Sequence, residues 1–138
     1  KSLPAAQTAQ TLKALELMQR LPERRTRLWE NLNALRSGLR AGGLDVGNPQ
    51  GAVTSVWMRG VRALPAVRAL EEEYGILANL VMYPAVPQGT SIIRMTLSAM
   101  HSLDDVAKVV DALTEINRRF HLQDSHEASE AELLEADA

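Results

Sequence analysis

One arginine interrupts a run of residues that otherwise has the composition of a buried β-strand. The run is SIIRMTLS, residues Ser91–Ser98, and the arginine is Arg94. Because side chains alternate between the two faces of a strand, Arg94 and Thr96 share the face opposite the apolar residues. A guanidinium on a rigid element can bind a carboxylate or a phosphate through two hydrogen bonds. Periodicity alone leaves two alternatives open: an exposed arginine without a ligand, and one paired with a neighbouring acid.

The segment before this strand is a loop. Tyr83–Thr90 contains Pro84 and Pro87, which forbid a helix and interrupt a strand ladder. Such a loop could line a substrate entrance beside Arg94, with Tyr83 as a candidate substrate-binding residue. It could equally be a plain connection between two strands.

The three histidines predict no catalytic or metal-binding group. His101 lies where the strand gives way to the next helix, and we expect a structural hydrogen bond there rather than proton transfer. His121 and His126 lie near acids close to the end of the chain, but a spacing of five residues in a polar segment does not indicate a metal site.

Apolar spacing and chain breakers predict the elements that must position Arg94. Predicted helices cover residues 5–20, a segment from Pro22 to Gly42-Gly43, residues 62–74, and a segment from Leu103 to Phe120. Predicted strands cover residues 52–58, 76–82 and 91–98. Ser102 and Asp105 resemble a capping box before the last helix.

The order of these elements is α-α-β-α-β-β-α. The last two strands are joined by a short loop, so we expect them to pair antiparallel. The order predicts an α+β fold: a small, mainly antiparallel sheet of three to four strands, covered by helices on one face, with a long N-terminal helical segment.

Composition excludes several classes of protein. The 138 residues fit one domain, 46% of them are hydrophobic, and there is no cysteine. Disulfides and thiolate metal sites are therefore excluded, and we expect a cytoplasmic protein. No apolar stretch approaches the roughly 20 residues of a membrane span. The sequence begins without methionine, and we expect it to be part of a longer chain.

The net charge of −2 hides an asymmetry along the chain. Residues 121–138 hold six acids and neither lysine nor arginine, which leaves 11 acids against 15 bases in residues 1–120. The bases form no dense run and aromatic residues are few, so we interpret the excess as a solvated surface and expect no nucleic-acid partner.

The segment YPAVPQGTSIIRMTLSAMH, followed by SLDDVAKVVDAL, resembles the C-terminal domain of the α-oxoamine synthases. These are pyridoxal 5'-phosphate (PLP) enzymes of fold type I that include serine palmitoyltransferase, aminooxononanoate synthase, aminoketobutyrate ligase and aminolevulinate synthase. The segments SLPAAQTAQTLKALELM, PERRTRLWENLNALRSGL and EEEYGILANLV are similar to the same family. The residues that fill its pattern in order are Pro84, Val86, Pro87, Gly89, Arg94, Ser98, Ala99 and His101.

The resemblance implies a homodimeric acyltransferase that condenses an amino acid with an acyl-CoA on PLP, with active sites at the subunit interface. It implies that Arg94 binds the carboxylate of the amino acid. Two parallel hydrogen bonds from the guanidinium would then fix the orientation of the bonds at the α-carbon. Ser2 lies close to where the family reaches the cofactor phosphate of the neighbouring subunit.

The resemblance covers residues up to about Phe120, so we expect a C-terminal domain over residues 1–120 and an acidic, disordered tail over residues 121–138. The family carries its Schiff-base lysine further upstream, and Lys1, Lys13 and Lys108 match no such motif. This segment alone is therefore expected to hold no catalytic residue and to be inactive. Two alternatives remain: another fold type I PLP enzyme such as an aminotransferase, and a non-catalytic dimerisation or regulatory module.

Overall fold

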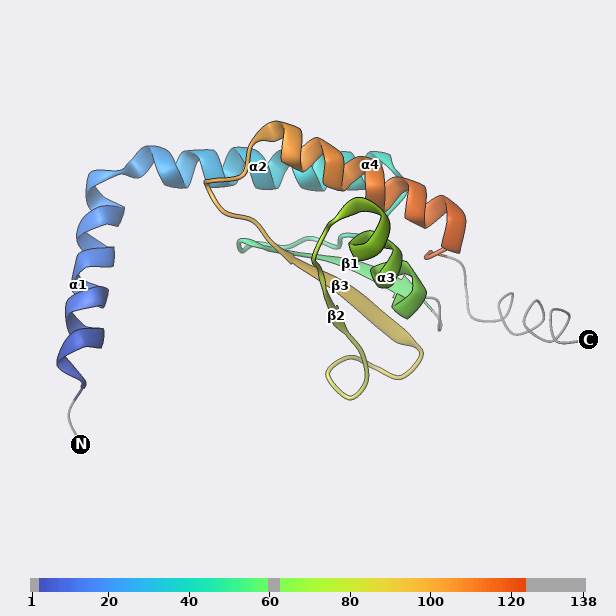
Figure 1. Cartoon of the computed structure of the whole chain (residues 1–138), viewed down its shortest axis with the longest axis horizontal. Coiled ribbons are helices and arrows are strands. Elements are labelled where there is room, and N and C mark those ends of the chain that lie inside the picture. The colour runs from blue at the N-terminus through green and yellow to red at the C-terminus, as the bar shows by residue number, and fades with distance from the viewer. Residues whose placement is uncertain (1–2, 60–62, 124–138) are drawn as a thin grey trace, which may run out of the picture.

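The computed structural model describes residues 3–59 and 63–123. Their elements follow the predicted order (Figure 1). The helices are α1 (Ala5–Arg20), α2 (Pro22–Ala41), α3 (Ala63–Tyr74) and α4 (Leu103–Phe120), and the strands are β1 (Val53–Arg59), β2 (Asn79–Val81) and β3 (Thr90–Thr96).

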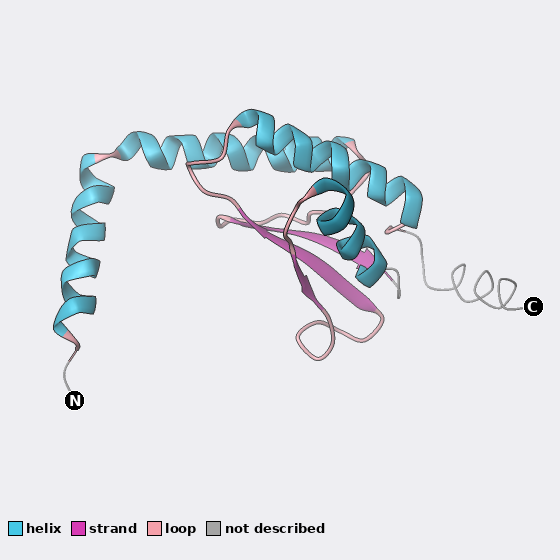
Figure 2. Ribbon diagram, viewed as in Figure 1, coloured by secondary structure: helices cyan, strands magenta, loops and turns pink. Residues whose placement is uncertain are grey.

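The three strands form one antiparallel sheet in the order β1-β3-β2, with β3 in the centre. Helices α2 and α4 run side by side above the sheet, and α3 packs against α4 and against β2 and β3 (Figure 2). The core lies between these helices and one face of β1 and β3, where Val56 and Ile93 are fully buried. The predicted α+β fold, with helices on one face of a small antiparallel sheet, is confirmed.

The helices α2 and α4 approach closely because two glycines face α4, one inside α2 and one directly after its last residue. A Cβ at Gly38 would lie 2.8 Å from the side chain of Val110, and a Cβ at Gly42 would clash with the side chain of Thr114. The missing Cβ atoms therefore let the two helices pack at a separation that larger residues would prevent.

A buried arginine fixes the beginning of β1. Arg36 on α2 is only 6% exposed; its Nε donates to Thr54 Oγ1 at 3.1 Å, and its guanidinium also donates to the carbonyl of Gly51. Burial, with a smaller contribution from the charge of Arg40, lowers the pKa of the Arg36 guanidinium. These bonds connect α2 directly to the strand next to β3.

Helix α1 leaves the body of the molecule at a sharp bend (Figure 1). Pro22 is the first residue of α2, and Leu21 before it has the non-helical dihedrals φ −124° and ψ 59°. A residue that precedes proline avoids the α conformation, so the two helices cannot continue into one another. None of the residues of α1 is buried.

Strand β2 is shorter than the predicted strand over residues 76–82. Gly75 adopts a left-handed conformation with φ 66°, and the N–H of Ile76 donates back to the carbonyl of Leu70 at 2.9 Å. The chain therefore uses residues 76–78 to leave α3, and pairing with β3 begins only at Asn79.

The packed part of the chain extends past Phe120, where the predicted acidic tail begins. Leu122 is fully buried, its carbonyl accepts from the N–H of Arg59 at 3.1 Å, and Gln123 donates to the carbonyl of Trp57 at 2.8 Å. Residues 121–123 therefore pack against β1. The rest of the predicted tail, from residue 124, lies outside the described residues.

Candidate functional site

Arg94 projects from the middle of the central strand, on the sheet face that none of the four described helices covers. In the register of the sheet it lies directly opposite Ser55 of β1 and Asn79 of β2. Its neighbours Ile93 and Met95 are buried on the helical side, while Arg94 is exposed. Among the described residues, no acid pairs with its guanidinium. The prediction that Arg94 faces away from the apolar residues of its strand is confirmed. The alternative that Arg94 pairs with a neighbouring acid finds no such acid in this part of the chain.

A cleft opens where β2 and β3 part. Asn79 and Arg94 form the last pair of this ladder, and residues 76–78 and 95–97 then diverge. The hollow between them has a volume of about 560 Å³ and is lined by residues 76–79 and 94–97, with His101 and Val109 beside them. The lining contains a guanidinium, a carboxamide, a hydroxyl and an imidazole, and no carboxylate. This donor-rich composition favours an anionic ligand.

Buried contacts hold the corner at one side of the cleft. Asn31 on α2 is 2% exposed, and its Nδ2 donates to the carbonyls of Ser98 at 3.3 Å and His101 at 2.9 Å. The N–H of Ser98 donates to His101 Nδ1 at 3.0 Å, which leaves the proton of a neutral ring on Nε2. The predicted structural hydrogen bond of His101 is therefore confirmed, and the same imidazole lines the cleft.

Two asparagines of this site were missed by sequence reasoning. Asn31 lies among Leu28, Leu32 and Leu35, on the apolar side of its helix. A polar residue in such a stripe must find a hydrogen-bond partner, and that signal was available. Asn79 carried no comparable signal, because its position opposite Arg94 depends on the register of two strands.

Tyr83 does not line the Arg94 cleft. It follows the other end of β2, two residues after Val81, and its side chain is 69% exposed. The loop that begins there is fixed by Val86, which is buried. A role for Tyr83 in substrate binding stays a prediction.

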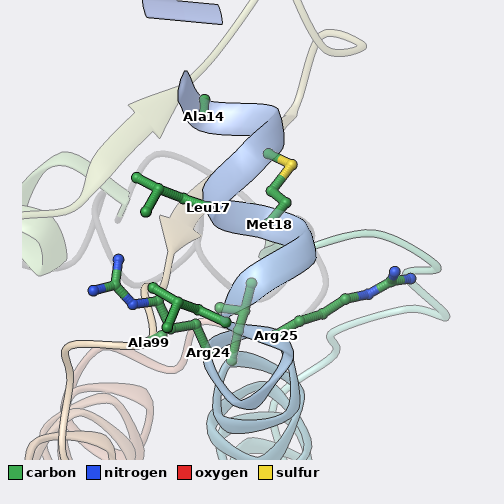
Figure 3. A pocket seen from close by; sticks show the side chains of 8 residues that line it. Ala14, Leu17, Met18, Arg24, Arg25 and Ala99 are labelled. Atoms are coloured by element: carbon green, nitrogen blue, oxygen red, sulfur yellow. The ribbon is translucent and has the colours of Figure 1, made fainter. Parts of the chain in front are cut away.

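A second hollow lies at the bend between α1 and α2 (Figure 3). It has a volume of about 590 Å³, and its lining is mostly apolar, with Leu17, Met18 and Ala99 beside Arg24 and Arg25. In Figure 3 the two guanidinium groups lie on opposite sides of the helix, and that of Arg25 points away from the aliphatic side chains. No polar groups converge here as they do beside Arg94, so this hollow is the weaker candidate for a site that recognises a carboxylate.

A family model gives the assignment. The model for aminotransferase class I and II matches residues 1–113. The chain belongs to the aminotransferase class I and II family. Among the residues that the structure describes, no helix combines the length and the apolar composition needed to cross a membrane.

Relatives within this class carry acyltransferase names. The cysteate-C-fatty acyltransferase of Capnocytophaga ochracea is 36% identical over 121 residues, 86% of this chain and 29% of the relative. The serine palmitoyltransferase of Sphingobacterium spiritivorum is 30% identical over 122 residues, 88% of this chain and 31% of the relative. The resemblance to α-oxoamine synthases is confirmed, and the chain spans under a third of the length of these relatives.

A solved relative has the same fold. The serine palmitoyltransferase of S. paucimobilis, with PLP and myriocin bound, matches with a TM-score of 0.77 at 28% identity. The match covers 87% of this chain and 31% of that one.

The described residues of this chain do not fit a PLP cofactor held as a Schiff base. Lys13 pairs with Glu16 at 3.0 Å on α1, Lys108 lies exposed on α4, and neither lines the Arg94 cleft. Lys1 and Ser2, the residue predicted near the phosphate of a neighbouring subunit, lie outside the described residues. What the described residues offer is the cleft beside Arg94 and its lining of hydrogen-bond donors.

Proposed function

We propose that this chain is the C-terminal domain of a longer PLP-dependent acyltransferase of the α-oxoamine synthase type, which condenses an amino acid with an acyl-CoA. The proposal is supported by the family, by the acyltransferase names of two relatives, and by coverage of 29% and 31% of their lengths. The remainder of such an enzyme would supply the Schiff-base lysine, so this domain alone would be inactive. A cytoplasmic homodimer with active sites at the subunit interface belongs to the same proposal.

The role of this domain is to hold the carboxylate of the amino acid through Arg94. The observation that carries this role is a guanidinium on the central strand, at the mouth of a cleft, without an acidic partner among the described residues. Two parallel N–H donors fix both the position and the rotation of a carboxylate. Fixing the carboxylate orients the bonds of the α-carbon, which decides the bond that can react.

Arg94→Ala and Arg94→Lys in the complete enzyme test this role. A hydrogen bond to a charged group contributes roughly 1.5–3 kcal/mol, so Arg94→Ala should raise the KM for the amino acid by roughly 100-fold. Arg94→Lys keeps the positive charge but cannot donate two parallel hydrogen bonds. Its KM for the amino acid should therefore lie between those of the wild type and Arg94→Ala. The amino acids to assay are glycine, L-alanine, L-serine and L-cysteate, with the KM for acyl-CoA as the internal control.

Ethanolamine, which is serine without its carboxylate, is the matched ligand control. The wild-type enzyme should bind L-serine more tightly than ethanolamine, and Arg94→Ala should abolish that difference. Unchanged amino-acid affinity in Arg94→Ala would overturn the carboxylate role.

An aminotransferase is the second candidate, because the matching family model carries that name. Such an enzyme would turn over a 2-oxo acid as its second substrate and ignore acyl-CoA. A non-catalytic dimerisation or regulatory module would retain the parent activity in Arg94→Ala. Assays of the purified enzyme with each second substrate separate these outcomes.

A further inference from the structure

Asn79 is the polar residue of β2 that lies directly opposite Arg94, on the cleft side of the sheet. The two residues are opposed across the β2–β3 ladder, so their side chains leave the same face. Both are exposed, and both line the cleft where the strands part. Within the described part of the chain, neither side chain makes a hydrogen bond. Two unpaired donors therefore lie side by side at the mouth of one cavity.

Ser55 provides an internal comparison. It opposes Arg94 from the other strand, β1, on the same face of the sheet, but it does not line the cleft. Arg94 thus has a polar residue opposite it on each neighbouring strand, and of these two only Asn79 lines the same cavity. A ligand in the cleft that contacts the guanidinium therefore has the carboxamide of Asn79 beside it.

We propose that Asn79 is a second ligand of the carboxylate that Arg94 binds, and that its Nδ2 donates to one of the two carboxylate oxygens. The proposal rests on the proposed function of Arg94. A carboxylate has about four lone-pair positions, and a bidentate guanidinium uses two of them. Directly opposed residues in an antiparallel ladder have Cβ atoms roughly 4.5–5.5 Å apart, so the carboxamide reaches the flank of an ion held by the arginine.

The chemistry of the cleft supports a donor rather than an acceptor at this position. The other polar groups in the lining are the hydroxyl of Thr96 and the imidazole of His101, whose Nδ1 is already used by the N–H of Ser98. With a neutral ring, the proton of His101 is on Nε2 and can also be donated. A carboxylate at position 79 would instead pair with Arg94 and repel an anionic ligand.

The test compares Asn79→Ala, Asn79→Asp and Ser55→Ala in the complete enzyme, with binding of L-serine, L-cysteate and ethanolamine measured by calorimetry. Asn79→Ala should weaken binding of the tighter amino acid roughly 10-fold, since one hydrogen bond to a charged group is lost. Asn79→Asp should weaken it at least as much as Arg94→Ala does, roughly 100-fold. Ser55→Ala should leave amino-acid affinity unchanged, and ethanolamine affinity should be unchanged in all three variants.

A double-mutant cycle measures how strongly position 79 and Arg94 are coupled in amino-acid binding, and the KM for acyl-CoA shows whether the enzyme is still folded. In an Arg94→Ala background, Asn79→Asp should cost much less than it does in the wild type, because the ion pair it forms is gone. The KM for acyl-CoA should stay unchanged in every variant. Two outcomes would overturn the role of Asn79 and leave that of Arg94 standing. In the first, amino-acid affinity falls in Arg94→Ala but is unchanged in Asn79→Ala. In the second, Ser55→Ala lowers that affinity as much as Asn79→Ala does. Arg94→Ala without effect would instead overturn the carboxylate role proposed for Arg94, on which the role of Asn79 rests.

Discussion

Helix α1 and the Arg94 cleft both present groups without partners in the described part of the chain, but these groups differ in kind. The exposed groups of α1 are apolar: Leu12 is 64% and Met18 71% exposed. Those of the cleft are polar, and the corner beside them is held by the buried Asn31. The cleft is therefore shaped by contacts within the chain. A single helix of about this length gains little stability from its own backbone alone, and none of the residues of α1 is buried against the described body.

The largest expected effect is a difference in the free energy of unfolding between a substitution in the packed body and one on α1. Leu113 on α4 is fully buried in the core, and Leu113→Ala should lower the free energy of unfolding by about 2–5 kcal/mol. Leu12→Ala removes the same atoms from an exposed position on α1, and should change it by about 0.5 kcal/mol or less. Urea unfolding of this chain, followed by circular dichroism, measures both.

Equal losses in these two variants would break the comparison. They would mean that α1 packs against the body in solution, so that Leu12 is as buried as Leu113. A matched m-value in the two variants is needed for the free energies to be compared.

A smaller effect is expected at the corner of the cleft. Asn31→Ala leaves the carbonyls of Ser98 and His101 without their donor, and should cost about 1–3 kcal/mol of stability. Asn33→Ala removes an exposed side chain from the same helix and should have almost no effect. Hydrogen exchange at residues 98–102 should increase in Asn31→Ala more than at α3, which reports loosening of this corner rather than of the whole fold.

Uniform acceleration of exchange in Asn31→Ala, equal at the corner and at α3, would contradict a local anchor. Asn31 would then stabilise the fold without shaping the cleft in particular.

Sequence periodicity predicted the helices, the order of the elements and the outward direction of Arg94. These features follow from local rules: the alternation of side chains in a strand, the apolar stripe of α4, and the capping box that the structure shows between Ser102 and Asp105. Each rule involves residues only a few positions apart.

The shape of the cleft could not be predicted in the same way. Its opening depends on the position at which β2 begins to pair, and the turn at Gly75 delays that pairing until Asn79. The anchor at Asn31 acts on carbonyls 67 and 70 residues away. Asn31 signals that some partner exists, whereas the identity of that partner depends on the packing of α2 against the end of β3.

The smallest expected effect concerns the first turn of α4, beside the cleft, compared with the first turn of α1. Helix α4 starts beside the cleft with a capping box, in which Asp105 Oδ2 accepts from the N–H of Ser102 at 2.9 Å and from its hydroxyl at 2.8 Å. Helix α1 has no side-chain cap at Pro4. The hydrogen bonds from Ser102 hold the pKa of Asp105 below its ordinary value of 3.8, and the bond from the backbone N–H contributes more than the bond from the hydroxyl.

Because the folded pKa is lowered, the stabilisation by Asp105 is complete above the unfolded value and is lost as the pH falls through the folded one. The free energy of unfolding should therefore decrease below about pH 4 in the wild type, and less so in Asp105→Asn. Asp104→Asn is the control, because it removes a carboxylate from the same turn and leaves the capping box intact. Identical slopes in the wild type and Asp105→Asn would show that the box adds nothing to folding, and that the start of α4 is no better fixed than that of α1.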